Sequence, residues 1–229
     1  GLVVGEGTGI VVLKRLEDAI AANDTIHAVI TGTGASNDIE GNLVGPASEG
    51  QVRAMVQAYE QAGWSPADIQ YMECHGSGTR VGDQVELASI KALLDRFGCP
   101  DASLSIGSVK SNIGHMLTAA GAAGFIKTVA AMNEKTMPPS LNFTEAPENS
   151  ILNTSRIRVQ ARCEEWARQN GSASRKAAVS AFGFGGINAH LLVEEYRKTA
   201  SSVYIEKPDI TKNDERLKQV ACAIVGMDV

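Results

Sequence analysis

The feature that most constrains this chain is a polar turn between an apolar strand and a helix of very small residues. The strand ends in Gly107-Ser108-Val109, and the turn Lys110-Ser111-Asn112-Ile113-Gly114-His115 follows it. The run Thr118-Ala119-Ala120-Gly121-Ala122-Ala123-Gly124 comes next. Because small side chains let other backbones approach closely, this helix can lie inside a layered domain. The pattern therefore predicts a lysine and a histidine at the start of a buried helix, facing a pocket.

Composition excludes several kinds of function. The chain has 229 residues, enough for a large core, and its charged fraction of 21% and net charge of −5 are ordinary. It has no basic stripe with interleaved aromatic residues, which argues against nucleic acid as a partner. The most apolar helix, expected over residues 113–132, is interrupted by Lys127 and rich in Gly and Ala, so we expect no membrane span.

Cysteine spacing argues against a zinc or other metal site and against a disulfide framework, because the cysteines lie far apart and form no Cys-x-x-Cys. They are Cys74, Cys99, Cys163 and Cys222. A reducing compartment, the cytoplasm, fits this usage best.

Both ends of the sequence look like interrupted motifs, so we expect an excised piece of a longer protein. We predict one domain over residues 1–196 and a polar linker over residues 197–218. Residues 219–229 are expected to start a following domain. The alternative for that last stretch is a strand that returns to the sheet of the first domain.

Strand and helix patterns alternate along the chain, which predicts an α/β fold with helices layered on a sheet. Strands are expected over residues 7–13, 26–34, 69–73, 104–109, 157–159, 177–181 and 189–193, and helices over residues 14–22, 49–63, 84–97 and 113–132. The last two strands predict an antiparallel element. Residues 34–50 are expected to form a long irregular loop, and Ser65 before Pro66 predicts a short helical turn. Nucleotide-binding glycine motifs do not occur.

Two histidines occupy the same kind of position, directly after a strand in a turn that contains glycine. His75 lies in the loop 73–79, and His115 ends the lysine-containing turn. Such turns let a ligand approach the backbone, so the pair is a candidate site. We expect His27 and His190 to be structural. Cys74 precedes His75, but neighbours on a strand point to opposite faces, so a Cys-His nucleophile pair is not expected.

Four ordered segments resemble the C-terminal half of β-ketoacyl synthases. They are residues 5–15, residues 73–86 with Glu73-Cys74-His75-Gly76-Ser77-Gly78-Thr79, residues 110–121, and Phe182-Gly183-Phe184-Gly185-Gly186-Ile187-Asn188-Ala189-His190. The resemblance runs to about Tyr196 and is greatest to ketosynthase domains of type I polyketide and polyunsaturated-fatty-acid synthases. It implies a thiolase-like fold whose two similar halves stack as α-β-α-β-α layers, with this chain supplying chiefly the second half.

The resemblance implies an acyltransferase of fatty-acid or polyketide biosynthesis that performs a decarboxylative Claisen condensation. The malonyl group would be carried on the phosphopantetheine of an acyl carrier protein, with no cofactor bound directly to the chain. His75 and His115 would be catalytic, because their ring N–H groups would hold the thioester carbonyl and stabilise the enolate. Lys110 would set the local field and hold the loop through a carboxylate such as Glu86, although the sequence does not assign that partner. A histidine near a helix N-terminus and a lysine should stay neutral.

Further roles come from the same resemblance. Ser77 and Thr79 would bind the phosphopantetheine arm, with Ser77 departing from the commoner threonine while keeping the hydroxyl. Phe184 would gate the site and contribute its backbone N–H to an oxyanion hole. Asp83 and Glu86 would support the site, and the loop glycines Gly183, Gly185 and Gly186 would let the gate move.

The resemblance also implies a nucleophilic cysteine in a Cys-Ser-Ser context, which none of the four cysteines has. We therefore expect the chain alone to be inactive. The parent protein, with the N-terminal half of the same ketosynthase, is expected to be an active homodimer. Residues 220–228 resemble the first strand of another ketosynthase-like unit.

Two alternatives remain at this point. One is a non-catalytic, chain-length-factor-like partner that shapes the acyl tunnel and the dimer, although such partners often lose the histidines that this chain keeps. The other is a thiolase of acyl-CoA degradation, which the lysine-then-histidine turn disfavours.

Overall fold

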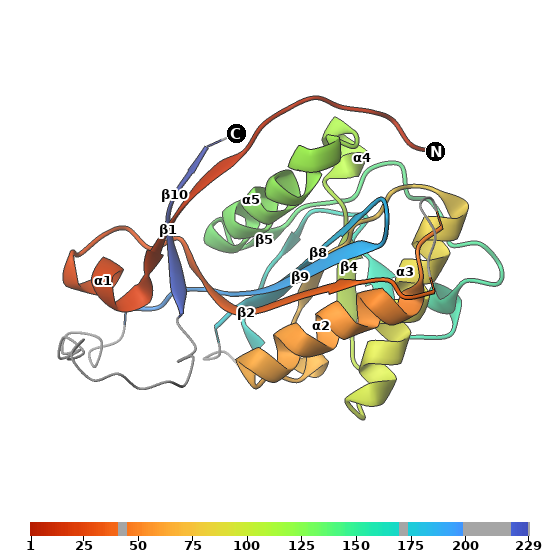
Figure 1. Cartoon of the computed structure of the whole chain (residues 1–229), viewed down its shortest axis with the longest axis horizontal. Coiled ribbons are helices and arrows are strands. Elements are labelled where there is room, and N and C mark those ends of the chain that lie inside the picture. Colours follow the sequence, from red (N-terminus) through yellow and green to blue (C-terminus); the bar gives the residue numbers. More distant parts are fainter. Residues whose placement is uncertain (41–44, 170–173, 199–220, 229) are drawn as a thin grey trace.

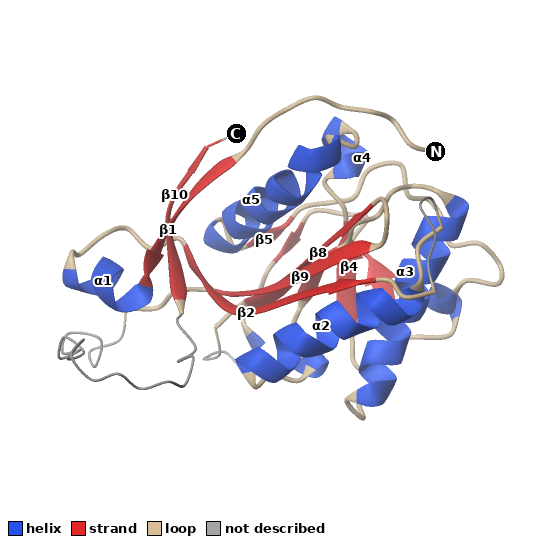
Figure 2. Cartoon of the chain, in the orientation of Figure 1, coloured by secondary structure: helices blue, strands red, loops and turns tan. Residues whose placement is uncertain are grey.

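The computed structural model describes residues 1–40, 45–169, 174–198 and 221–228. In this part of the chain eight strands form one sheet, in the order β1-β10-β2-β9-β8-β3-β4-β6 (Figure 2). The strands are β1 (Ile10–Arg15), β2 (Ala28–Asn37), β3 (Tyr71–Glu73), β4 (Leu104–Gly107), β6 (Ile157–Val159), β8 (Lys176–Gly183), β9 (Ile187–Glu194) and β10 (Cys222–Asp228). A separate pair joins β5 (Thr136–Met137) to β7 (Glu164–Glu165).

Strand direction divides the sheet into two parts. The neighbours β8, β3, β4 and β6 run parallel. The pairs β8–β9, β9–β2, β2–β10 and β10–β1 are antiparallel. This confirms the predicted α/β sheet with an antiparallel element formed by the last two predicted strands.

Helices cover both faces of the sheet (Figure 1). Helices α2 (Ser48–Ala62) and α3 (Arg80–Arg96) pack on one face, and α5 (Ala120–Asn133) packs on the other. The alternation of β3 shows why both faces are buried: Met72 lies in the core under α2 and α3, whereas Tyr71 lies in the core under α5. The resulting α-β-α unit is the half of the thiolase-like stack that the sequence predicts. No helix in the described ranges is both long and apolar enough to cross a bilayer.

Short elements follow local signals. They are α1 (Leu16–Ala21), α4 (Lys110–Ile113), and the 3-10 turns η1 (Pro66–Asp68), η2 (Leu117–Ala119) and η3 (Ile151–Asn153). The turn η1 confirms the expectation from Ser65 and Pro66, since the Ser65 hydroxyl accepts the Ala67 N–H and the Asp68 carboxylate accepts the Ser65 N–H. The loop expected to begin at residue 34 begins later, because β2 continues to Asn37 in register with β9.

The helix expected over residues 113–132 is wrong in its first third. The short helix α4 ends at Gly114, whose φ of 77° and ψ of −178° suit only glycine. His115 then forms an isolated parallel bridge with Val4, and α5 begins only at Ala120. Gly114 is a local signal for this stop, whereas the bridge of His115 to Val4 depends on a distant partner.

The C-terminal strand β10 lies between β1 and β2 and pairs with both. This position matches the alternative of a strand that returns to the sheet of this domain. Most of the predicted linker, residues 199–218, lies outside the described residues. The domain boundaries at residues 196 and 219 stay predictions.

Candidate active site

Two imidazole rings face each other beyond the carboxyl ends of neighbouring parallel strands. His75 follows β3, and His115 follows β4 after the short helix α4. The ring centroids lie 5.3 Å apart with the ring planes at 80°, an edge-to-face arrangement. The carboxyl ends of parallel strands meet at one edge of a sheet, where ligands bind in open α/β folds. The structure therefore brings together the two histidines selected from the sequence.

Both imidazoles are held in the neutral form. Burial, followed by the charge of Lys110 and the neighbouring His115, lowers the pKa of His75 to about 3. Burial and then Lys110 also lower the pKa of His115, which is only 8% exposed. The predicted cause, a helix N-terminus, needs correction, because a break in the helix separates His115 from α5. Burial is the larger cause at both histidines.

A hydrogen bond decides which nitrogen of His115 carries the proton. The Nδ1 atom accepts the backbone N–H of Leu117 at 3.1 Å. Leu117 reaches this position with a φ of 48°, in the left-handed region that residues with side chains rarely adopt. A neutral imidazole that accepts at Nδ1 carries its proton on Nε2. His115 therefore offers an Nε2–H donor.

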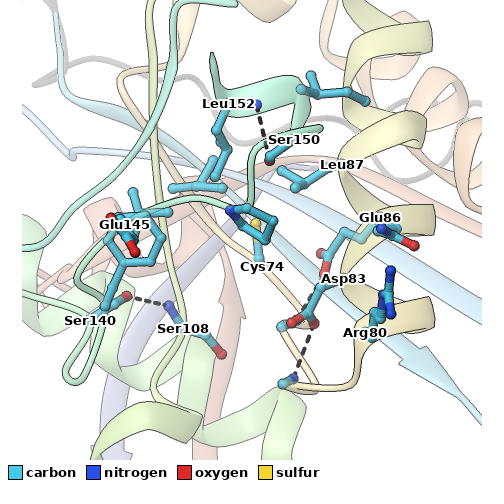
Figure 3. A pocket seen from close by; sticks show the side chains of 18 of the residues that line it. Cys74, Arg80, Asp83, Glu86, Leu87, Ser108, Ser140, Glu145, Ser150 and Leu152 are labelled. Atoms are coloured by element: carbon cyan, nitrogen blue, oxygen red, sulfur yellow. Dashed lines mark hydrogen bonds between the residues drawn. The ribbon is translucent and has the colours of Figure 1, made fainter. Parts of the chain in front are cut away.

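Two carboxylates of α3 hold the loop that carries His75, and both are labelled in Figure 3. Glu86 accepts the backbone N–H groups of His75 and Gly76, each at 2.8 Å. Asp83 accepts the N–H of Gly78 at 3.1 Å. Positions three apart share one helix face, so a single helix supplies both acceptors. Burial raises the pKa of Glu86 to about 7 despite these hydrogen bonds.

Lys110 acts on the site through its field. Burial lowers its pKa, while the charges of Glu73 and then Glu86 raise it. Among the described residues, no carboxylate oxygen lies within 4 Å of the Lys110 Nζ. Glu86, the example given for a partner of Lys110 that the sequence left open, therefore makes no direct ion pair with it, because the Glu86 carboxylate accepts backbone N–H groups.

Glu73 is a buried charged residue whose place in the site was missed from the sequence. Its carboxylate accepts the Val109 N–H at 2.5 Å, the Tyr71 hydroxyl at 2.7 Å and the Lys127 ammonium at 2.8 Å. Lys127 also donates to the Tyr71 hydroxyl at 2.9 Å. A glutamate at the end of a buried strand and a lysine in an apolar helix are the signals that could have found the pair, because buried charges need partners.

The hydroxyl pair and the predicted gate lie at the margin of the site. The Ser77 and Thr79 hydroxyl oxygens are 2.9 Å apart. Phe184 lies in the turn between β8 and β9 and is 70% exposed, followed by Gly185 and Gly186 at φ values of 80° and 76°. Phe182, which sequence reasoning did not select, packs against His75 with ring centroids 5.8 Å apart. Phe182 lies within β8 and its side chain joins the core, whereas Phe184 lies beyond the end of that strand.

A cavity of about 990 Å³ opens between α3 and the segment over residues 140–152 (Figure 3). Cys74, Gly76 and Asp83 contribute to its wall, but neither histidine does. Burial raises the pKa of the Cys74 thiol well above its ordinary value. Cys74 is thus a buried, protonated thiol. No cluster of three or more His, Cys, Asp or Glu that could hold a metal occurs in the described ranges.

Comparisons with known proteins indicate one family. The family model for the C-terminal domain of β-ketoacyl synthase matches residues 27–144. The polyketide synthase PksL of Bacillus subtilis is 41% identical over 198 residues, which cover 86% of this chain and 4% of that protein. One polypeptide of a polyunsaturated fatty acid synthase from Thraustochytrium is 38% identical over 212 residues, covering 89% of this chain and 7% of that protein.

A solved structure gives the same result. The ketosynthase from module 6 of the bacillaene synthase of Bacillus subtilis superimposes with a TM-score of 0.76 at 38% identity. The match covers 81% of this chain and 35% of that ketosynthase, so the chain spans about a third of the solved domain. Family model, relatives and fold agree: this chain belongs to the β-ketoacyl synthase family, as the C-terminal half of a ketosynthase of the type I polyketide synthase kind.

Proposed function

We propose that this chain supplies the decarboxylating half of a ketosynthase active site that performs Claisen condensation with a malonyl thioester. The observation that carries the proposal is the facing pair of neutral imidazoles, one of them with its donor on Nε2. A neutral donor binds a thioester carbonyl, and the bond strengthens as negative charge develops on that oxygen. The positive field of Lys110 favours the same charge.

Each bond change is assigned to a place in the site. Loss of carbon dioxide breaks the bond between the carboxylate carbon and the α-carbon, and the electron pair moves into the thioester as an enolate. Ring N–H groups of His75 and His115 stabilise the enolate oxygen. The α-carbon then attacks the carbonyl of an acyl thioester, and the cysteine thiolate leaves. That cysteine comes from the preceding half of the ketosynthase, because none of the four cysteines here has the Cys-Ser-Ser context, and Cys74, next to His75, is buried and protonated.

The malonyl group arrives on the phosphopantetheine arm of an acyl carrier protein. Ser77 and Thr79 bind the arm, which their paired hydroxyls beside the His75 loop support. Phe184 gates the entrance, and its exposed position in the β8–β9 turn supports that role. The complete enzyme is a homodimer.

The test uses the complete ketosynthase, made by joining this chain to its preceding half. Release of carbon dioxide from a malonyl-acyl carrier protein measures decarboxylation, and intact-protein mass spectrometry measures acylation of the cysteine. His115→Ala should lower decarboxylation about 10²-fold to 10³-fold, as expected when one oxyanion donor is removed. Acylation should continue at the wild-type rate.

His27→Ala is the matched control, because His27 contacts Asn133 away from the imidazole pair. It should change neither measurement. Undiminished decarboxylation in His115→Ala would refute the role of this histidine. Stable acylation of a cysteine in the present chain alone would refute the assignment of the nucleophile to the preceding half. A complete protein that neither acylates nor decarboxylates would support the chain-length-factor-like alternative.

A further inference from the structure

The buried carboxylate of Glu73 joins three elements beneath the catalytic edge. One oxygen accepts the backbone N–H of Val109, which follows β4, and the other accepts from Tyr71 on β3 and Lys127 on α5. The Glu73 side chain is 2% exposed and that of Lys127 is 13% exposed. A charge at this depth is stable only when donors satisfy it. The three donors therefore fix the place of the carboxylate.

The Glu73 carboxylate in turn fixes the start of the lysine-histidine turn. Val109 immediately precedes α4, and no side chain of its own caps that helix. Its N–H instead donates to the Glu73 carboxylate at a distance of 2.5 Å. Lys110 is the next residue, and His115 follows after only one helical turn. A displacement of Val109 would therefore move both of these groups.

The charge of Glu73 also acts on Lys110. Among the charges that raise the pKa of Lys110, Glu73 contributes most, and Lys127 opposes it. Glu73 thus acts on two lysines, and it contacts one of them, Lys127. The charge on Lys110 lowers the pKa of His75 and His115. A change at Glu73 should therefore reach both imidazoles.

Space for the carboxylate depends on a glycine in α5. A Cβ at Gly124 would lie 3.0 Å from the Cγ of Glu73 and 3.3 Å from its Oε1. Both distances are shorter than ordinary van der Waals contact between such atoms. A glycine inside a helix costs about 1 kcal/mol relative to alanine. The space that the Glu73 side chain needs explains why residue 124 is glycine although glycine destabilises the helix.

We propose that Glu73 is a positioning residue of the decarboxylating site: anchored by Lys127 and Tyr71, it fixes the turn that carries Lys110 and His115 and balances the Lys110 charge. The inference rests on the proposed function, because decarboxylation is its readout. It adds a residue that touches neither substrate nor imidazole.

The main variant is Glu73→Gln in the complete ketosynthase, which keeps the shape of the side chain and removes its charge. A displaced turn should lower the kcat of decarboxylation about 10²-fold, as small misplacements of catalytic groups do. Acylation of the cysteine should be unchanged, because it does not use the enolate donors.

The pH profile gives a second readout. The charged and titratable groups that interact with Lys110 are Glu73, Cys74 and His75 at and after the end of β3, Asp83 and Glu86 from α3, His115 in its own turn, and Lys127 from α5. Removing the Glu73 charge leaves Lys127 less opposed, which lowers the pKa of Lys110. The alkaline limb of decarboxylation should therefore move to lower pH in Glu73→Gln.

A double variant separates positioning from simple burial of an ion pair. Glu73→Gln with Lys127→Met removes both charges, so no unpaired charge remains in the core and thermal stability should recover. The kcat should stay about 10²-fold low, because Lys127 no longer anchors the side chain that fixes Val109. Glu164→Gln is the control, since it neutralises an exposed ion pair with Arg158 and should leave kcat and pH profile unchanged.

The outcomes distinguish this inference from the proposed function. If His115→Ala loses decarboxylation but folded Glu73→Gln keeps wild-type kcat and pH profile, the inference is overturned alone. Recovery of kcat in the double variant would also overturn it. If His115→Ala keeps full decarboxylation, the proposed function itself fails. If Glu73→Gln does not fold, Gly124→Ala decides: a folded protein with kcat lowered about tenfold supports the inference, and unchanged kcat overturns it.

Discussion

The two histidine-bearing turns lie at the same edge of the sheet but are held in different ways. The turn of His75 is held locally by Glu86 and Asp83 of the helix that follows it. The turn of His115 is held from a distance: the His115 N–H donates to the Val3 carbonyl at 2.7 Å, and the Gly5 N–H donates to the His115 carbonyl at 3.0 Å. One donor is therefore fixed by a loop and its helix, and the other by the chain's first residues together with Glu73 at the start of the turn.

This difference teaches that the two donors can be disturbed separately. Changes in α3 should reach His75 first, whereas changes in the first residues of the chain should reach His115 first. The imidazoles are close enough for the two turns to share one reaction. Their supports lie on separate elements, so the coupling between them is testable.

The largest separate effect is expected from Gly5→Ala. A Cβ at residue 5 would overlap the backbone carbonyl of Ile113, so the His115 turn must move. Decarboxylation should fall about 10²-fold because a donor is misplaced. Imidazole NMR of histidine-labelled protein should show a larger shift for His115 than for His75.

Gly1→Ala is the control for this prediction, because a Cβ at residue 1 would meet nothing within 4 Å. It should leave decarboxylation and both imidazole signals unchanged. Equal shifts of the two imidazole signals in Gly5→Ala would show that the two turns move as one unit. That result would contradict the claim that the two donors can be disturbed separately.

A smaller effect, confined to the other turn, is expected from Glu86→Gln. The wild-type carboxyl has a pKa of about 7, so it is ionised above that pH and gains a proton below it. Protonation turns one of its two acceptor oxygens into a donor, which leaves the N–H of His75 or Gly76 without a partner. Wild-type decarboxylation should therefore decrease as pH falls through about 7.

Glutamine keeps one acceptor oxygen but does not titrate. Glu86→Gln should lower decarboxylation about tenfold at pH above 7, the equivalent of one hydrogen bond to a charged group. The variant should also lack the acidic limb near pH 7, as measured by a pH series of carbon dioxide release. Persistence of that limb would show that another group titrates. Glu164→Gln again serves as the surface control.

The same contrast explains what could be predicted from the sequence. The His75 turn and its carboxylates lie within one loop and helix, so the motif that suggested them already contained Asp83 and Glu86. The helical turn at Ser65 and the hairpin of β8 and β9 are also local, and they were predicted correctly.

Features that depend on distant partners were missed. The break before His115 is completed by Val4, and the ion pair of Glu73 with Lys127 joins a strand end to a helix more than one element away. Gly114 signals that a helix can stop there, and Lys127 in an apolar helix signals a buried partner, but neither names the residue that it meets. Tertiary contacts decided the identity of these partners.

The smallest expected effect tests whether the support of His75 depends on the stability of α3. Thr79 caps this helix by accepting the Gly82 N–H at 3.2 Å, so Thr79→Ala should lower the free energy of unfolding by about 1 kcal/mol. Thr79→Ser keeps the hydroxyl and should retain most of that stability, as measured by urea denaturation of the complete ketosynthase. A weaker first turn should disturb the backbone amide signals of His75 and leave those of His115 in place. Equal disturbance of both sets of signals would mean that α3 supports the whole edge of the sheet. The contacts of the His115 turn with the first residues of the chain would then not hold it independently of α3.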